Sequence, residues 1–207
     1  MMKRYVGPPD SAIWLLGDSN PVAWQDYLDE PLDKRFPTRH VIWTPIESVI
    51  QRCLFAQFKM RLDDNMLYVR NAVEDPEYKR KKEKLRLAEE IAIFGKLMSE
   101  YRPLLVLCFG QFAFEFARRA RQESGEYPFR HWSIKELAKE FSGRSASVSR
   151  SAVNVLPLLH AVVAQKLEEC HGEFSGGTGN YFTYVGGKIA EVFVNNPTHP
   201  GLSRLMI

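Results

Sequence analysis

Hydrophobic positions along the chain fall into short continuous runs, and four of these runs predict buried strands. They cover residues 12–16, 66–69, 104–109 and 153–159, and each is followed by a glycine or a polar residue. Short apolar runs that end at turn residues are typical of strands covered on both faces of a sheet. A shorter run at 41–44 predicts an edge strand.

A second pattern, with apolar residues three and four positions apart, predicts helices. It is clearest where five apolar side chains fall on one helix face: Leu87, Ile91, Phe94, Met98 and Tyr101. Pro103 ends this helix, the run 104–109 follows at once, and Gly110 leads into a helix predicted over 111–122. A helix, a strand, a turn and a helix with short connections are typical of a parallel α/β sheet.

The remaining segments complete the prediction of a single domain. Residues 22–37 form a helical or irregular connection, and 123–150 form a basic, mobile insertion. Asn180 is placed to cap the last of four further predicted helices, although Gly186 and Gly187 inside that helix cost roughly 1 kcal/mol each. These four helices cover 45–59, 133–141, 162–170 and 181–194. We expect all 207 residues to form one three-layer α/β/α domain around a mostly parallel sheet of about four strands.

Composition excludes several classes of protein. No apolar run approaches the ~20 residues that a membrane span needs, and no apolar segment follows the basic residues at the start. Cys53, Cys108 and Cys170 are dispersed, without the spacing of a zinc site, an iron–sulfur cluster or a disulfide framework. We therefore expect a cytoplasmic protein that does not contact a membrane and uses no metal and no cofactor.

The positive charge is concentrated in the middle of the chain. The formal net charge is +3, but residues 79–150 alone hold 16 basic and 9 acidic residues. Such an excess is expected of a surface that meets phosphate groups. A solvated helix face is the alternative interpretation of the same charge run.

Polar residues follow each predicted core strand. Gly17-Asp18-Ser19-Asn20-Pro21 follows the first strand, Arg70-Asn71 the second, Gly110-Gln111 the third, and His160 the last. Ligands of open parallel sheets bind at the carboxyl ends of the strands, and these ends share one edge. The four loops are therefore predicted to line one cleft.

This order of elements resembles the uracil-DNA glycosylase superfamily, as a divergent member. The shared order is an apolar strand with a Gly-to-Asn-Pro loop, a strand ending in Asn, a helix–Pro–strand–Gly–helix unit, and a strand ending in His. The similarity is best over 66–117 and extends from 12 to 193. The resemblance implies a DNA-binding protein that flips a base from the stack and hydrolyses the N-glycosidic bond of uracil or a related damaged base.

The resemblance also implies roles for individual residues. Asp18 or Asn20 would hold the attacking water, since branches of the superfamily place the responsible side chain at either position. Asn71 would read the edge of the pyrimidine, because an amide both donates and accepts hydrogen bonds. His160 would donate a hydrogen bond to the base oxygen on which negative charge develops.

Further residues are implied in binding. The base would lie among Gly17, Ser19, Pro21, Asn71 and Gly110, against an aromatic ring supplied by Phe55, Phe36 or Trp24. The DNA backbone would meet the basic run, and an apolar wedge would follow the histidine. These predicted DNA-binding residues are Lys79, Arg80, Lys81, Lys82, Ala161 and Val162.

Two departures from the superfamily pattern point to an altered substrate or to loss of activity. The loop after the first strand has one residue more than the Gly-x-Asn-Pro form. The superfamily's His-Pro-Ser is replaced by His160-Ala161-Val162, which lacks the serine that contacts phosphate.

Two alternative functions use the same chain. Gly17-Asp18-Ser19 and Asn196-Pro-Thr-His199-Pro200 resemble the sequence blocks of SGNH-type serine esterases, which would make Ser19 the nucleophile and His199 the base. The second alternative is a catalytically inactive module of the same fold that binds nucleic acid or nucleotides. Dinucleotide and P-loop motifs are absent from the sequence.

Overall fold

The fold is built on one mixed sheet. The computed structural model describes residues 3–20, 27–79, 83–160 and 180–196 and the single positions 163, 172, 174, 202 and 207. The sheet has five strands in the order β1-β3-β2-β4-β5. Strands β2 to β5 are parallel to their neighbours, and β1 pairs antiparallel with β3 at one edge. The strands are β1 (Tyr5–Val6), β2 (Ile13–Gly17), β3 (Tyr68–Asn71), β4 (Leu105–Phe109) and β5 (Asn154–Leu158).

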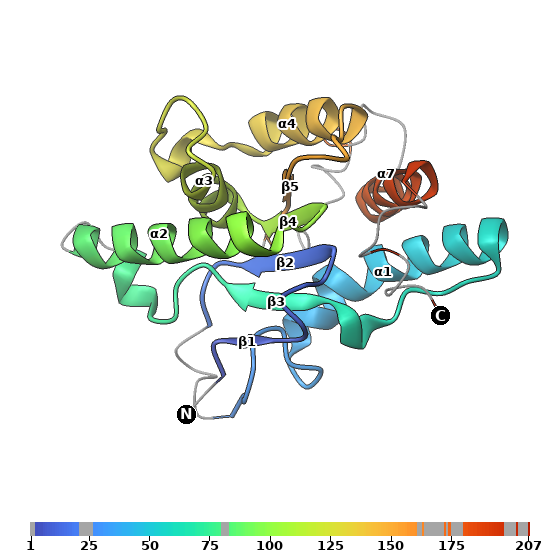
Figure 1. Cartoon of the computed structure of the whole chain (residues 1–207), viewed down its shortest axis with the longest axis horizontal. Helices are drawn as coiled ribbons and strands as arrows, with labels where there is room; N and C mark the ends of the chain where they lie inside the picture. The colour runs from blue at the N-terminus through green and yellow to red at the C-terminus, as the bar shows by residue number, and fades with distance from the viewer. Residues whose placement is uncertain are drawn as a thin grey trace.

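Helices cover both faces of this sheet. Helices α1 and α7 pack side by side against one face, α2 and α3 lie over the other, and α4 lies beside β5 (Figure 1). The longer helices are α1 (Pro37–Phe58), α2 (Lys84–Tyr101), α3 (Gln111–Ala120), α4 (Ile134–Ala146) and α7 (Tyr181–Asn195). Short 3-10 turns are η2 (Asp64–Met66), η3 (Pro76–Lys79) and η5 (Phe129–His131). The predicted α/β class is confirmed, and the sheet is mixed with one strand more than predicted.

Alternating side chains explain why the central strands are apolar throughout. On β2, Trp14 points toward α2, where its ring centroid lies 5.7 Å from that of Phe94. On β4, Phe109 points toward α1, with its ring centroid 6.5 Å from that of Trp43. Because helices cover both sides, every residue of β4 is buried. This is the environment in which a strand needs no polar face.

Two expectations about the edges of the sheet were wrong. Residues 41–44 belong to α1, because the buried residues Ile42, Ile46 and Ile50 are four positions apart and continue the helical face. Pro45 lies inside this helix, which starts with Pro37. The fifth strand, β1, was not predicted, because a two-residue strand carries no periodic signal.

The packing of α7 against α1 explains why α7 contains a glycine at position 186, despite the helix propensity that it costs. A Cβ at Gly186 would lie 2.6 Å from the Cβ of Val49 and 2.9 Å from the carbonyl oxygen of Ile46, both on α1. The glycine therefore allows α1 and α7 to approach closely. Asn180 caps this helix as predicted, since its Oδ1 accepts hydrogen bonds from the backbone N–H groups of Phe182 and Thr183.

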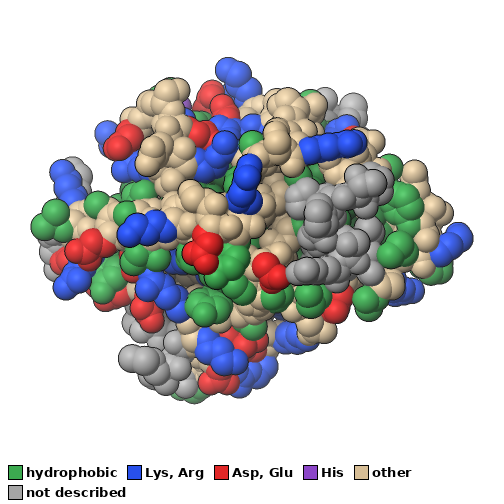
Figure 2. All heavy atoms as spheres, in the orientation of Figure 1, with side chains coloured by type: hydrophobic (Ala, Val, Ile, Leu, Met, Phe, Trp, Pro, Cys, Tyr) green, Lys and Arg blue, Asp and Glu red, His purple; other side chains and the backbone are tan. Residues whose placement is uncertain are grey.

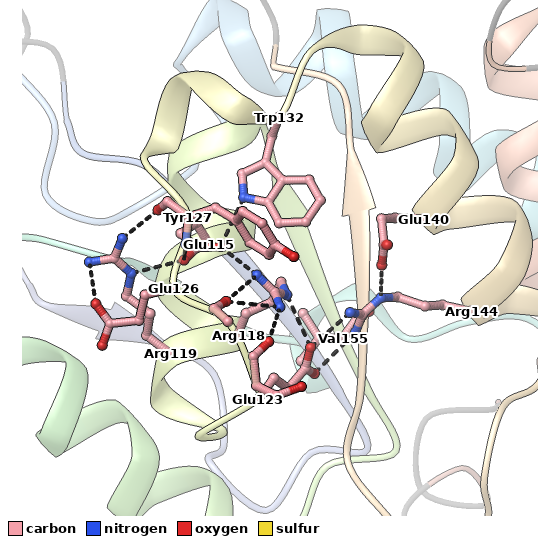
Figure 3. Close-up of polar contacts among 12 residues, drawn as sticks. Glu115, Arg118, Arg119, Glu123, Glu126, Tyr127, Trp132, Glu140, Arg144 and Val155 are labelled. Atoms are coloured by element: carbon pink, nitrogen blue, oxygen red, sulfur yellow. Dashed lines mark hydrogen bonds and ion pairs between the residues drawn. The ribbon is translucent and has the colours of Figure 1, made fainter.

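Some charged side chains of the basic middle segment are buried inside the fold. Glu115 of α3 is fully buried, and it accepts hydrogen bonds from the side chains of Arg118, Arg119 and Trp132 and from the backbone of Tyr127 (Figure 3). We call Glu115, Arg118, Arg119, Glu123 and Arg144 the arginine network. It joins α3 to α4 and to the segment between them.

The arginine network changes the interpretation of the charge excess. Arg118 and Arg144 both bind Glu123, with N···O distances of 3.1 and 2.8 Å. On the face shown in Figure 2, Lys and Arg side chains are interspersed with Asp and Glu and form no continuous basic patch. Several arginines of the basic segment are thus paired within the fold, and the segment as a whole keeps its positive excess. Among the described helices, none has the length and apolarity needed to cross a membrane.

Candidate functional site

A pocket of about 160 Å³ lies at the carboxyl ends of the parallel strands. Gly17 ends β2, Asn71 ends β3, Phe109 ends β4, and His160 follows β5. The structure therefore brings the predicted loops together, as parallel strands require. The lining residues are Leu15, Gly17, Asp18, Ser19, Asn20, Leu32, Phe36, Thr38, Ile42, Val69, Asn71, Phe109 and His160.

Two amides form one side of the pocket. Nδ2 of Asn71 donates a hydrogen bond to Oδ1 of Asn20 at 2.8 Å, and Asn20 is buried. A Cβ at Gly17 would lie only 2.3 Å from Oδ1 of Asn71, so a side chain there would displace the amide. The loop after β2 is fixed to the segment after β3 by backbone hydrogen bonds from Ala72 to Gly17 and from Val73 to Asp18.

A lysine joins two other residues of the loop. Lys79, at the end of η3, has its ammonium 3.2 Å from Oδ2 of Asp18 and donates to Oγ of Ser19 at 2.8 Å. Oδ1 of Asp18 is buried and has no hydrogen-bond partner among the described residues. A buried carboxylate oxygen without a partner is costly, so this atom is suited to bind a water or a ligand.

His160 follows β5, at the opposite edge of the parallel strands from Asn71, which ends β3. Burial lowers its pKa below the ordinary value, Asp18 acts in the opposite direction, and Lys79 adds to the lowering. The imidazole is therefore neutral at pH 7. Gly110 leaves room for it: a Cβ at this glycine, whose φ is +94°, would lie 2.9 Å from the Cβ of His160. Gly110 thus lies against the side chain of His160 and, contrary to the prediction, is not among the residues that line the pocket.

The rest of the wall is apolar and includes one of the predicted aromatic candidates. Phe36, directly before α1, lines the pocket. Phe55 does not, because it lies near the far end of α1 with 46% of its surface exposed. Its ring instead packs beneath Lys59 and Arg61, whose charged groups are 5.4 and 5.3 Å from the centroid. Of the three predicted aromatic candidates, Phe36 thus lines the pocket, Phe55 does not, and Trp24 is not described.

Several predicted site residues lie outside the described part of the chain. They are Pro21, Trp24, Arg80, Lys81, Lys82, Ala161, Val162 and His199. Of the predicted DNA-binding residues, Lys79 is described, and it points toward Asp18 rather than away from the protein. Ser19 lines the pocket, whereas the histidine that an esterase would need is not described. No cluster of three potential metal ligands occurs within the described ranges.

Sequence reasoning missed the residues that α1 and the segment before it contribute. Leu32, Thr38 and Ile42 line the pocket, yet neither their types nor their spacing mark them as site residues. Their position follows from the crossover of the chain between β2 and β3. The contact between Lys79 and Asp18 was also missed, because a lysine within a basic run looks like surface charge.

Comparisons of the sequence with protein families and with curated proteins do not assign it to a family. No protein-family model matches the sequence, and no curated protein matches it significantly. The function must therefore be inferred from the pocket itself.

Proposed function

We propose that this protein is a DNA glycosylase that hydrolyses the N-glycosidic bond of uracil or a related damaged base. The observation that carries the proposal is the convergence of Asp18, Asn71, His160 and Phe36 on one pocket of about 160 Å³. This volume is below the ~300–1,000 Å³ typical of sites for drug-sized ligands. It suits a single flat ring, such as a base flipped out of the DNA stack.

Base recognition falls to Asn71 and Phe36. An amide has two N–H donors and a carbonyl acceptor, so Asn71 keeps capacity for both kinds of hydrogen bond after it donates to Asn20. A pyrimidine edge offers the complementary donors and acceptors. The ring of Phe36 and the apolar wall provide a surface on which the base can lie.

His160 stabilises the departing base. As the bond between the sugar carbon and the base nitrogen breaks, its electron pair moves onto the base and the sugar becomes oxocarbenium-like. A neutral imidazole N–H can donate to the base oxygen that gains negative charge. The lowered pKa of His160, caused first by burial, favours this neutral form.

Asp18 is the better candidate for holding the water. Oδ1 of Asp18 is buried without a described partner, whereas Oδ1 of Asn20 already accepts from Asn71. Lys79 fixes the other carboxylate oxygen. The water held by Asp18 would add to the sugar carbon and pass its proton to the carboxylate, and the negative charge of Asp18 would oppose the positive charge on the sugar.

The architecture supports this proposal but does not identify the superfamily. Four parallel strands with helices on both faces are what the resemblance implies. DNA is the proposed partner, and phosphate contacts by basic side chains would make its binding weaken steeply with added salt.

The proposal is tested with oligonucleotides that carry one uracil, in single-stranded and duplex form, without added metal. We expect free uracil and an alkali-labile abasic site. Phe36→Leu should slow the reaction, and Phe55→Leu is the matched control because its ring is outside the pocket. Wild-type protein that binds DNA but leaves uracil, hypoxanthine and xanthine intact would instead be a binding module.

A serine-directed probe separates the glycosylase from the esterase alternative. Lys79 pairs with Asp18 and donates a hydrogen bond to Oγ of Ser19, so it is arranged as a donor to this hydroxyl. A fluorophosphonate should therefore leave Ser19 unlabelled. Labelling at Ser19 that is lost in His199→Ala would favour the esterase.

A further inference from the structure

A second pocket, of about 190 Å³, lies on the other face of the sheet. Tyr68 and Arg70 of β3 point into it, whereas Val69 and Asn71 point into the first pocket, because neighbouring residues of a strand face opposite sides. The second pocket is bounded by β1, β3 and α2. Its lining residues are Arg4, Tyr5, Pro9, Tyr68, Arg70, Ile93, Leu97 and Tyr101.

The buried floor of this pocket carries a guanidinium whose positive charge is only partly compensated. Arg70 is only 2% exposed, and its Nη2 has no hydrogen-bond partner among the described residues. The nearest carboxylate, Glu90, is 3.5 Å from Nη2 and also pairs with Arg4. One buried carboxylate is thus shared by two guanidinium groups.

The remaining contacts of Arg70 are neutral. Its Nε donates to the carbonyl oxygen of Asn71 at 3.1 Å, and its guanidinium lies over the ring of Phe94. Burial lowers the pKa of Arg70, while Tyr68 and Glu90 act in the opposite direction. Buried charges are normally paired, so an excess of positive charge here favours a bound anion.

The upper walls of the pocket are aromatic and apolar. Tyr5, which is 49% exposed, has its ring centroid 5.4 Å from that of Tyr68. Ile93 and Leu97 of α2 form the opposite wall. Two carboxylates, Glu100 and Asp10, act on Tyr101 at the outer rim, where both are exposed and solvent screens their charges.

We propose that this pocket binds a small oxyanion carried on a flat apolar ring, of the aryl carboxylate or aryl phosphate class. The anionic oxygens would meet Arg4 and the charge of Arg70, and the ring would lie between Tyr5 and the apolar residues of α2. Such a ligand completes the charge balance and fits the volume. The inference does not depend on the glycosylase proposal.

Calorimetric titration of the full chain tests it with four probes. Benzoate or phenyl phosphate should bind saturably with one site per protein, and comparison of the two identifies the preferred anion. Phenol lacks the anion and inorganic phosphate lacks the ring, so each should bind ~10-fold more weakly or worse, since each lost interaction is worth ~1.4 kcal/mol or more. Failure of both ring-bearing anions to bind at millimolar concentration would overturn the proposal.

Substitutions of residues that line the second pocket test whether the anion binds there. Arg4→Gln should weaken the preferred anion by ~10-fold or more, as expected for loss of a charge-assisted hydrogen bond. Tyr5→Ala should weaken both ring-bearing probes and leave inorganic phosphate unaffected. Arg61→Gln, at the exposed ring of Phe55, is the matched control and should change nothing. Unchanged affinity in both Arg4→Gln and Tyr5→Ala would exclude this pocket.

A spectroscopic readout is independent of these substitutions. The indole N–H of Trp14 donates to the carbonyl oxygen of Pro9, which lines the pocket. Its NMR resonance should shift as the anion binds. The indole N–H of Trp132 donates to Glu115 in the arginine network and should not move. A shift of Trp132 without one of Trp14 would place the ligand elsewhere.

Discussion

The arginine network and the first pocket each centre on a carboxylate with a basic neighbour, and they differ in how completely that carboxylate is satisfied. Both oxygens of Glu115 accept hydrogen bonds, from four different residues (Figure 3). In Asp18, Oδ2 pairs with Lys79, but Oδ1 has no partner in the described structure. A fully satisfied buried network specifies structure, whereas an unsatisfied group beside a pocket is suited to hold a ligand.

The largest expected effect tests the structural side of this comparison. Glu115→Gln keeps the shape of the side chain but removes the buried charge that pairs with Arg118 and Arg119, so that Arg118 keeps only Glu123. Removal of one partner of a buried ion pair costs about 3–5 kcal/mol of unfolding free energy, which urea denaturation would measure. Base excision by the folded fraction should be unaffected.

The matched control for this substitution is Glu126→Gln. Glu126 lies 3.6 Å from Arg119, but its side chain is 76% exposed. Exposed ion pairs contribute about 0–1 kcal/mol, so the unfolding free energy of this variant should be close to that of the wild type. Equal stability losses in Glu115→Gln and Glu126→Gln would contradict the structural role of the network.

A smaller effect is expected from a methyl group placed against the pocket amide. In Gly17→Ala the new Cβ would meet Oδ1 of Asn71, so the amide must move from the edge of the base. We expect the KM for a uracil substrate to rise about 2- to 10-fold, because a lost hydrogen bond to a neutral group is worth ~0.5–1.5 kcal/mol.

Gly143→Ala is the control for the added methyl group. Gly143 lies in α4, and a Cβ added there would have no described atom within 4 Å. This variant should keep the wild-type KM and gain up to ~1 kcal/mol of stability from helix propensity. If Gly17→Ala also keeps the wild-type KM, Asn71 does not read the base.

The smallest effect concerns pH. Because burial lowers the pKa of His160 in the folded protein, the unfolded chain binds its proton more readily in the window below the ordinary value of 6.5. Stability should therefore decrease as pH falls from about 6.5 through the folded pKa. His160→Gln should remove this part of the pH dependence, as measured by unfolding midpoints from pH 7 to 5. An identical pH profile in both proteins would show that folding does not lower the pKa of His160.

The convergence of the site could be predicted from the sequence, because parallel strands place their carboxyl ends on one edge. The positions of Gly17, Asn71 and His160 follow from three apolar runs and the residues after them. The choice between Phe36 and Phe55 could not be predicted. It depends on where α1 begins, and the β-branched residues around Pro45 obscured that start.

The pairing of the buried charges could not be predicted from the sequence either. Glu115 is one acidic residue in a basic segment, and no pattern shows that a single buried carboxylate receives Arg118 and Arg119. Such pairing depends on how α3 and the segment after it fold back on each other. The second pocket was missed for the same reason, since Arg4 and Arg70 meet only through the pairing of β1 with β3.

The most direct test of the proposed chemistry is the single-turnover rate of uracil excision by Asp18→Asn compared with the wild type. The substitution keeps the shape of the side chain but removes the carboxylate that would hold the water and oppose the charge on the sugar. We expect the rate to fall by about 10²–10⁴-fold, with the affinity for the uracil oligonucleotide and the unfolding midpoint close to wild type. Asn20→Ala should act mainly on base affinity, through Asn71. A wild-type rate in Asp18→Asn together with an inactive Asn20→Ala would contradict the assignment of the water to Asp18.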